Sequence, residues 1–458
     1  MPKVDRPNVV VFFTDQQRWD TTGVHGNPLG LTPNFDRMAQ SGTHLYNAVT
    51  CQPVCGPARS CFQTGQYATS TGCFKNGIAL PTDVPTLGGC FRDGGYQTGY
   101  IGKWHLHVPD EGKEREFGPV PASHRAGYDY WLASNVLEFT SEAYQTTLYD
   151  NDDNPVSLPG YRVDAVTDAA IRYMDSHHGN DPFFLFISYI EPHHQNRLDD
   201  FPAPDGYRER YQSRWVPPDL LKLEGSAHQH LGGYYGMVKR LDEALGRVQD
   251  ALKNLGLNEN TVLMQTSDHG CHFKTRNSEY KRSCHESSVR IPTAIQGPGF
   301  NSGGQIREMT SLIDFPPTLL DSAGLPAPPE MQGRTILPLV SRNATEWPEE
   351  AFIQISESQV GRAVRTQRWK YGVDAPDGRA SQDSGATSYV EQYLYDLEAD
   401  PYELNNLAGE ESHKDVSETM RRRLVNRMRE AGESEPTIVQ APVKRSGQRS
   451  VLPGESLL

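Results

Sequence analysis

Residues 55–59, Cys-Gly-Pro-Ala-Arg, combine a reactive side chain, a helix start and a fixed cation. Pro57 has the φ angle of a first helical turn, where its missing N–H costs nothing, and Gly65 is a helix stop. Cys55 is therefore predicted at a helix N-terminus, where exposed N–H groups and the helix dipole favour an anion. Arg59 places a guanidinium about one turn further on. The stretch predicts chemistry on a phosphate or sulfate group.

Two further sets of polar residues follow predicted strands. The apolar run 9–13 is typical of a buried central strand of a parallel sheet, and Asp15 comes directly after it. Open α/β sheets bind ligands at the carboxyl ends of their strands, so Asp15 is a candidate metal ligand. The strand predicted over 96–101 leads into Lys103 and His105, which alternate and so face the same side of an extended chain.

These stretches resemble the motifs of the type I sulfatases, a formylglycine-dependent family of the alkaline phosphatase superfamily with aryl and glycan sulfatase members. Cys-x-Pro-x-Arg resembles the family signature, and Gly-Lys-Trp-His at 102–105 resembles a second motif. Asp268 with His269, the block around Lys281 and the closing turn 395–407 follow in the family's order, over nearly the whole chain. The resemblance implies a sulfuric ester hydrolase, hence an enzyme.

The resemblance also implies a modified residue and a metal. A separate formylglycine-generating enzyme would convert Cys55 to 3-oxoalanine (formylglycine), whose hydrate is the nucleophile. One divalent cation, expected to be Ca²⁺ with Mn²⁺ or Mg²⁺ as alternatives, would be held by Asp15, Gln16, Cys55, Asp268 and His269. Gln16 stands where the family has a second Asp; its amide oxygen can still bind a hard cation, although the site loses one negative charge.

Each remaining motif residue takes a role from the resemblance. Arg59 would hold the formylglycine hydrate, and Lys103 and Lys281 would neutralise the sulfate oxygens. His193, which follows Glu-Pro after the strand predicted over 183–190, would protonate the leaving alcohol. His105 would take the proton when sulfate is eliminated. The expected catalytic residues are thus Cys55, Arg59, Lys103, His105, His193 and Lys281.

The elements that must position these residues indicate an α/β fold. We expect a large mixed, mainly parallel sheet sandwiched by helices over residues 1–340, as in alkaline phosphatase. A smaller C-terminal α+β subdomain, 345–433, would carry an antiparallel sheet and one covering helix. Its short strands are expected at 352–356, 363–366, 369–373 and 392–396, and residues 434–458 are expected to be a polar tail.

Composition limits the partners and the compartment. The chain has 458 residues and a formal net charge of −14, which argues against nucleic acid or an anionic membrane as the main partner. Its seven cysteines are scattered, which fits reduced thiols in a cytoplasm. The N-terminal MPKVDRPN lacks an apolar signal region, so a cytoplasmic enzyme is expected; a secreted or periplasmic protein trimmed of its leader would look the same.

The expected substrate is a sulfated mono- or oligosaccharide, selected by the loop-rich stretches 107–160 and 198–230. Trp19, His194 and Arg197 are candidate sugar contacts. The alternative function is a phosphonate monoester or phosphodiester hydrolase of the same superfamily, which shares the signature and the metal pairs. A non-catalytic protein that binds sulfated glycans would have little use for the two lysines and two histidines. A thiol redox or zinc protein is disfavoured because no cysteine pair has CxxC spacing.

Overall fold

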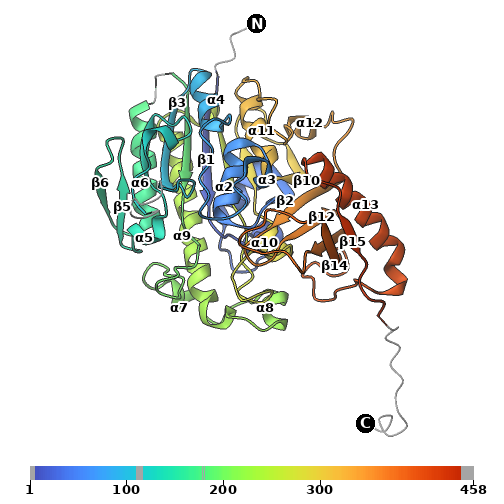
Figure 1. The fold of residues 1–458 in the computed structure, drawn as a ribbon. Helices are drawn as coiled ribbons and strands as arrows, with labels where there is room; N and C mark the ends of the chain where they lie inside the picture. Colours follow the sequence, from blue (N-terminus) through green and yellow to red (C-terminus); the bar gives the residue numbers. More distant parts are fainter. Residues whose placement is uncertain (1–5, 110–116, 178, 180, 445–458) are drawn as a thin grey trace.

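Two β-sheets organise the computed structural model, which describes residues 6–109, 117–177, 179 and 181–444. Ten strands form a large mixed sheet in the order β10-β2-β9-β8-β1-β7-β3-β4-β5-β6 (Figure 1). The strands are β1 Asn8–Thr14, β2 Thr43–Val49, β3 Gln97–Lys103, β4 Tyr130–Ser134, β5 Gln145–Tyr149, β6 Pro155–Pro159, β7 Phe183–Ser188, β8 Thr261–Ser267, β9 Ala294–Gln296 and β10 Gly304–Ser311.

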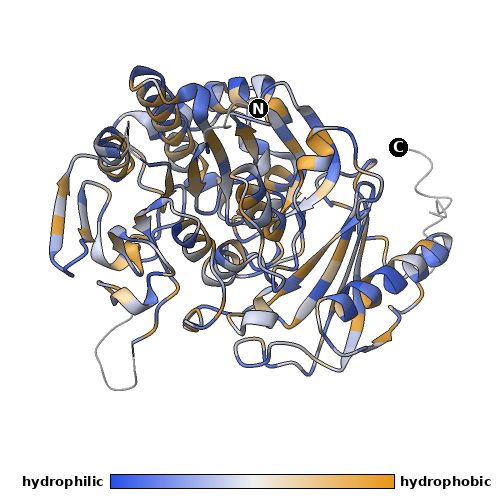
Figure 2. Ribbon diagram, turned by 90° about the horizontal axis from the view of Figure 1, so that it is seen from above, coloured by the Kyte–Doolittle hydropathy of each residue, from blue (hydrophilic) through white to orange (hydrophobic). Residues whose placement is uncertain are grey.

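The centre of this sheet is parallel and fully covered. β1 pairs in parallel with both β7 and β8, and β3 continues the parallel set on the far side of β7. Every residue of β1, β7 and β8 is buried. Strands covered on both faces have no polar side, which explains their continuous apolar runs. In Figure 2 hydrophobic residues gather in these central strands. The predicted fold class is confirmed.

Helices cover both faces of the sheet. Val9, Val11 and Phe13 of β1 pack in one core with residues of α2, α4 and α11. Val10 and Phe12 pack in a second core with residues of α1, α6 and α9. Successive side chains of a strand point to opposite faces, so one strand supplies both cores. The covering helices are α1 Pro33–Ser41, α2 Cys55–Thr64, α4 Leu87–Asp93, α6 Arg162–His177, α9 Ala227–Asn254 and α11 Phe315–Ser322.

Short helices lie in the connections between the main strands and helices. The α-helical ones are α3 Ala68–Thr71, α5 Leu137–Thr140, α7 Tyr207–Tyr211, α8 Pro218–Lys222, α10 Glu286–Val289 and α12 Leu337–Val340. The 3₁₀ turns are η1 Trp19–Thr21, η2 Gly23–His25, η3 Ala122–His124, η4 Asn258–Asn260, η5 Leu312–Asp314 and η6 Glu411–His413. Among the described residues, the helices include none with the length and apolar character needed to cross a membrane.

The second sheet lies beside the large one, towards the C-terminus (Figure 1). Its strands, in order, are β11 Glu350–Ile355, β12 Gly361–Thr366, β13 Trp369–Asp374, β14 Ser388–Asp396 and β15 Thr437–Val439. The first four are antiparallel, and β15 joins β14 in parallel. The helix α13 Lys414–Glu430 covers the sheet with Met420, Leu424 and Met428. An antiparallel sheet with one covering helix was predicted and is confirmed.

Part of the stretch expected to be a tail is structured. Residues 437–439 form β15, although the polar sequence around them has no alternating apolar pattern, and backbone hydrogen bonding to β14 supplies the pairing. Residues 445–458 lie outside the described residues. The predicted domain boundaries near 340, 345 and 433 stay predictions.

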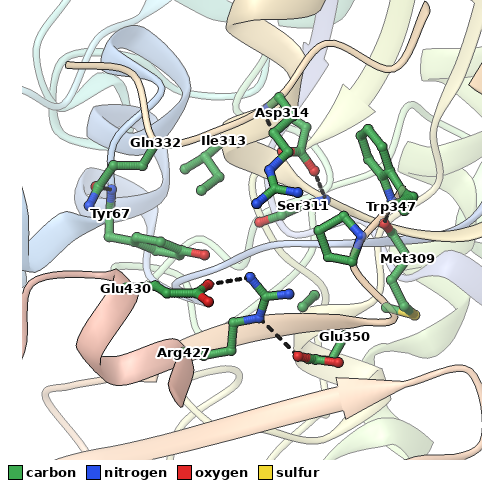
Figure 3. Close-up of a pocket in the computed structure, with 13 residues that line it drawn as sticks. Tyr67, Met309, Ser311, Ile313, Asp314, Gln332, Trp347, Glu350, Arg427 and Glu430 are labelled. Atoms are coloured by element: carbon green, nitrogen blue, oxygen red, sulfur yellow. Dashed lines mark hydrogen bonds and ion pairs between the residues drawn. The ribbon is translucent and has the colours of Figure 1, made fainter. Parts of the chain in front are cut away.

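A cavity of about 250 Å³ lies where α13 and β11 meet the main sheet (Figure 3). Arg427 of α13 contacts Glu350 of β11 at 3.0 Å and Glu430 at 2.6 Å. On the opposite wall the indole N–H of Trp347 donates to the Met309 carbonyl at 2.7 Å. None of the predicted catalytic residues lines this cavity, which therefore belongs to the junction of the two sheets and not to the site below.

Candidate active site

Cys55 is the first residue of α2, and all ten residues of that helix are buried. The helix ends at Gly65, whose φ of 65° is the left-handed conformation that glycine adopts without strain. The next N–H, that of Gly56, donates to the side-chain oxygen of Asn76 at 2.9 Å. The predicted helix start therefore exists and points its free end at the carboxyl edge of the sheet.

Four predicted metal ligands lie together at that edge. Asp15, Cys55, Asp268 and His269 each offer one ligand atom, and these atoms all lie within 4.8 Å of one another. Cys55 Sγ is 3.3 Å from His269 Nε2 and 3.5 Å from Asp15 Oδ1. β1 and β8 are neighbours in the sheet, so residues about 250 positions apart end side by side.

The fifth predicted ligand, Gln16, is in the same place. Its backbone N–H donates to Asp268 Oδ1 at 3.0 Å, and its side-chain nitrogen donates to Cys271 Sγ at 3.2 Å. The side-chain oxygen Oε1 is buried and has no hydrogen-bond partner among the described residues. A buried amide oxygen without a donor costs free energy, and a cation beside it would remove that cost.

The pKa values of the two metal-site carboxyls, Asp15 and Asp268, shift in opposite directions. Burial, and then the charge of Asp15, raise the pKa of Asp268 to about 7. Burial would also raise the pKa of Asp15, but Lys103, His193 and Arg59 outweigh it and the pKa of Asp15 is lowered. Two acids, an amide oxygen and an imidazole in one dry pocket are a donor set that suits a divalent cation. The residues present therefore fit the implied metal.

Arg59 lies behind the carboxylates. Its Nη2 is 3.0 Å from Asp15 Oδ2 and 3.4 Å from Asp268 Oδ2. Its Nη1 donates to Ser188 Oγ at 2.7 Å and to the Lys103 carbonyl at 3.0 Å. The hydrogen bonds of this guanidinium thus orient the metal-site acids and join the ends of neighbouring strands.

Two lysines contact different groups of the site. Lys103 Nζ, fully buried at the end of β3, is 2.8 Å from Asp15 Oδ2. Lys281 Nζ is 2.8 Å from Cys55 Sγ and 2.9 Å from His193 Nε2. Burial raises the pKa of the Cys55 thiol, but Lys103, Lys281, His269 and His105 outweigh it and the pKa is lowered well below its usual value. Cations thus outweigh burial at residue 55, and an anionic group bound there would meet them on an otherwise acidic protein.

The two predicted acid–base histidines face this pocket. His193 follows the cis peptide Glu191–Pro192, and its Nδ1 is buried without a hydrogen-bond partner among the described residues. Burial, and then Lys281, lower the pKa of His193. His105 has a φ of 61° and lies close enough to Cys55 to lower the thiol pKa. The structure therefore brings the predicted catalytic and metal-binding residues into one pocket.

Glu138 on α5 is a site residue that the sequence analysis did not find. Its Oε2 is 3.4 Å from Lys103 Nζ, and its side chain is 7% exposed. Burial would raise the pKa of Glu138, but Lys103, His193 and His105 lower it to about 2. The residue sits in the loop-rich stretch 107–160, where no pattern marks it. Of the candidate sugar contacts, Trp19 is buried under Arg290 and is closed to a ligand.

A small cavity opens next to Glu138. It has a volume of about 120 Å³, and Phe139, Arg197 and Leu198 are among the residues that line it. Leu198 is 59% exposed and Phe139 is 37% exposed. A carboxylate, a guanidinium and two apolar side chains form a wall on which a polar, ring-shaped group could rest beside the site.

Known proteins resemble this chain over most of its length. Residues 7–325 match the family model for sulfatase, and residues 278–430 match the C-terminal model of N-sulphoglucosamine sulphohydrolase. An ulvan-active sulfatase of Formosa agariphila is 30% identical over 93% of this chain and 82% of that protein. An N-acetylglucosamine-6-O-sulfatase of Bacteroides thetaiotaomicron is 24% identical over 88% of this chain and 83% of that protein. The crystal structure of a sulfatase, YidJ, from Bacteroides fragilis has a TM-score of 0.83 at 25% identity, over 94% of this chain and 97% of that one.

Proposed function

The chain belongs to the sulfatase family and is a sulfuric ester hydrolase, and we propose that it releases inorganic sulfate from a sulfated mono- or oligosaccharide. The observation that carries the proposal is the position of Cys55. Its side chain lies at a helix N-terminus, 2.8 Å from the Lys281 ammonium and among the acids Asp15 and Asp268. A group attached to residue 55 would therefore meet cations on one side and a metal-ligand set on the other.

Cys55 is proposed to be converted to formylglycine by a separate enzyme that reads the pentapeptide 55–59. The hydrated aldehyde would supply an oxygen nucleophile and a second hydroxyl that lets sulfate leave without further attack at sulfur. A thiol lacks that second hydroxyl. The signature itself supports this proposal, because all three of its defining residues are present and Cys55 and Arg59 share one short helix.

A divalent cation, with Ca²⁺ as the first choice, is proposed to be held by Asp15, Gln16, Asp268 and His269 together with residue 55. It would supply Lewis-acid stabilisation of charge on the sulfate oxygens. The unpartnered Oε1 of Gln16 and the paired acids support the assignment. Arg59 would hold the formylglycine hydrate and orient Asp15 and Asp268, since it hydrogen-bonds both acids.

The chain's own lysines would then neutralise negative charge, and its histidines would transfer protons. Lys281 and Lys103 are proposed to neutralise sulfate oxygens, Lys281 from the Cys55 side, and Lys103 also pairs with Asp15 and Glu138. His193 would donate a proton to the leaving alkoxide, since its ring lies 2.9 Å from Lys281 and so beside the bound ester. His105, which also lies near residue 55, would accept the proton of the second hydroxyl.

A sugar is the proposed alcohol half of the substrate. One matched protein and one matched family model carry a sulfated sugar in their names, N-acetylglucosamine-6-O-sulfatase and the C-terminal model of N-sulphoglucosamine sulphohydrolase. The cavity beside Glu138 and Arg197 has polar groups for hydroxyls and apolar groups for a ring face. All seven cysteines are free thiols in the structure, which supports a reducing compartment, and we propose that the enzyme acts in the cytoplasm on small sulfated sugars.

Sulfate release from a panel of defined sulfated mono- and oligosaccharides tests the proposal. We expect release from at least one sugar sulfate, measured by ion chromatography, and none from the Cys55→Ala variant. Comparing the hydrolysis rates of a sulfate ester and a phosphonate monoester with the same leaving group tests the alternative function. Faster hydrolysis of the phosphonate would contradict the sulfatase proposal, and unchanged sulfate release by Cys55→Ala would contradict the nucleophile.

A further inference from the structure

A second group of metal-binding side chains lies beside the active site. His194, Asp199 and His230 each offer one ligand atom, and these atoms all lie within 4.8 Å of one another. His194 and Asp199 belong to the loop that follows β7 and carries His193, whereas His230 lies on α9. We propose that these three residues bind a transition-metal ion of the zinc type, with water in the fourth position. Two imidazoles, one carboxylate and an open position are a donor set typical of zinc.

Each ring nitrogen of His194 contacts a side-chain oxygen. Its Nδ1 lies 3.1 Å from the side-chain oxygen of Asn196, and its Nε2 lies 3.0 Å from Asp199 Oδ1. A neutral imidazole has one N–H, so one ring nitrogen donates and the other offers a lone pair. When Nδ1 donates to the Asn196 oxygen, the lone pair of Nε2 and the Asp199 carboxylate lie side by side as two ligands for one ion. Zinc bonds of about 2.1 Å at a tetrahedral angle would set the two ligand atoms about 3.4 Å apart, near the 3.0 Å separation in the structure.

The third ligand has a support of its own. His230 is 5% exposed, and its Nδ1 has no hydrogen-bond partner among the described residues. That nitrogen lies 3.6 Å from Asp200 Oδ1, and Arg208 pairs with the same carboxylate. Metal-binding histidines are usually held by a carboxylate behind the ring, which orients the other nitrogen towards the ion. Arg208 neutralises Asp200, so the charge of Asp199 is left for the metal.

The cluster is built into the wall of the site and is open to solvent at one point. The His194 ring stacks on Tyr280 at a centroid distance of 4.1 Å, and both histidines contact Phe201. The Asp199 side chain is 70% exposed, so an ion could enter from that side. A bound ion would fasten the loop after β7 to α9, immediately next to His193. The proposal does not depend on the reaction proposed above.

Counting zinc tests the proposal directly. Four proteins are dialysed against about 10 μM zinc with calcium in excess, and bound zinc is measured by mass spectrometry. They are the wild type, Asp199→Ala, His230→Ala and the control His228→Ala. His228 is an exposed histidine on the same helix. We expect wild type and His228→Ala to hold one zinc per chain more than the other two variants. The metal-ligand set around Cys55 is present in all four proteins, so any zinc bound there adds equally to each and does not change the difference between them.

The thermal midpoint supplies a second measurement, since a ligand that binds only the folded state raises it. We expect zinc to raise the midpoint of wild type and of His228→Ala by more than that of Asp199→Ala, since any zinc bound around Cys55 acts equally on all three. Asp199→Ala removes a surface side chain, so this variant is expected to fold even if His230→Ala does not. Equal zinc content in wild type and Asp199→Ala would overturn the proposal, and would leave the sulfatase activity as a separate question.

Discussion

Replacing Lys281 by alanine is the sharpest test of the proposed mechanism. The Lys281 ammonium is 6% exposed and contacts both Cys55 Sγ at 2.8 Å and His193 Nε2 at 2.9 Å. It therefore joins the residue proposed as nucleophile to the residue proposed as general acid. The variant removes a cation from a dry pocket and adds no group that could replace it.

The expected loss follows from what one charged hydrogen-bond donor contributes in such a pocket. Removing a donor aimed at transition-state charge costs about 2.7–4 kcal/mol, which is about 10²–10³-fold in kcat. The loss should fall on kcat more than on KM, because the negative charge on the bridging ester oxygen grows as the alcohol leaves. A second effect concerns His193, whose pKa is lowered first by burial and then by Lys281. Without Lys281 the pKa of His193 rises, so the alkaline limb of the pH profile should move to higher pH.

Both effects can be measured on one sulfate ester across a range of pH. Lys253→Ala, an exposed lysine on α9, serves as the matched control and should keep wild-type kinetics. A Lys281→Ala variant that loses less than about tenfold in kcat would refute the role given to this ammonium. An alkaline limb that stays in place would separately refute the assignment of His193 as the proton donor next to Lys281.

Further predictions concern the nucleophile, the cation, the C-terminal core and a buried acid. Cys55→Ala should lose turnover entirely while its thermal midpoint stays near that of wild type; a large fall in the midpoint would show a structural role instead. Removing divalent cations with a chelator should abolish sulfate release, and Ca²⁺ should restore it; activity that survives exhaustive chelation would contradict the metal assignment. Leu424→Ala should lower the free energy of unfolding by about 2–5 kcal/mol in denaturant titrations, since Leu424 is fully buried between α13 and the second sheet, whereas Arg422→Ala on the exposed face should change it by less than about 0.5 kcal/mol. Burial raises the pKa of Asp242 to about 6, above its unfolded value of 3.8, so the folded state binds more protons between these values and this group makes stability fall as pH rises from about 4 to 6. Asp242→Asn should remove that part of the pH dependence, and an unchanged slope would contradict it.

The central strands and most of the site were predictable from the sequence for a simple reason. β1, β7 and β8 are covered on both faces, so they read as continuous apolar runs, and the polar residues that end them stand out. Because the strands are parallel neighbours, their carboxyl ends converge without any knowledge of the loops. Asp15 and Asp268 could therefore be placed at the same edge of the sheet, and the structure puts them there.

Glu138 and β15 were not predictable in this way. Glu138 lies in a four-residue helix within an irregular stretch, and only its contact with Lys103 marks it as part of the site. The strand 437–439 has three residues and no alternating pattern, so only its pairing with β14 defines it. In both cases a contact with a distant part of the chain decides the outcome, and neighbouring residues carry no sign of it.

The order in which the pocket is assembled sets a time limit on any enzyme that must reach Cys55. In the finished protein this thiol is 1% exposed, and β8 and Lys281 are among the parts that enclose it. Those parts leave the ribosome long after residue 55. At a synthesis rate of about 5–20 residues per second, the interval is on the order of tens of seconds. During that interval the pentapeptide is an accessible peptide; once the last walls close, an unconverted thiol stays beyond the reach of an enzyme unless the chain unfolds.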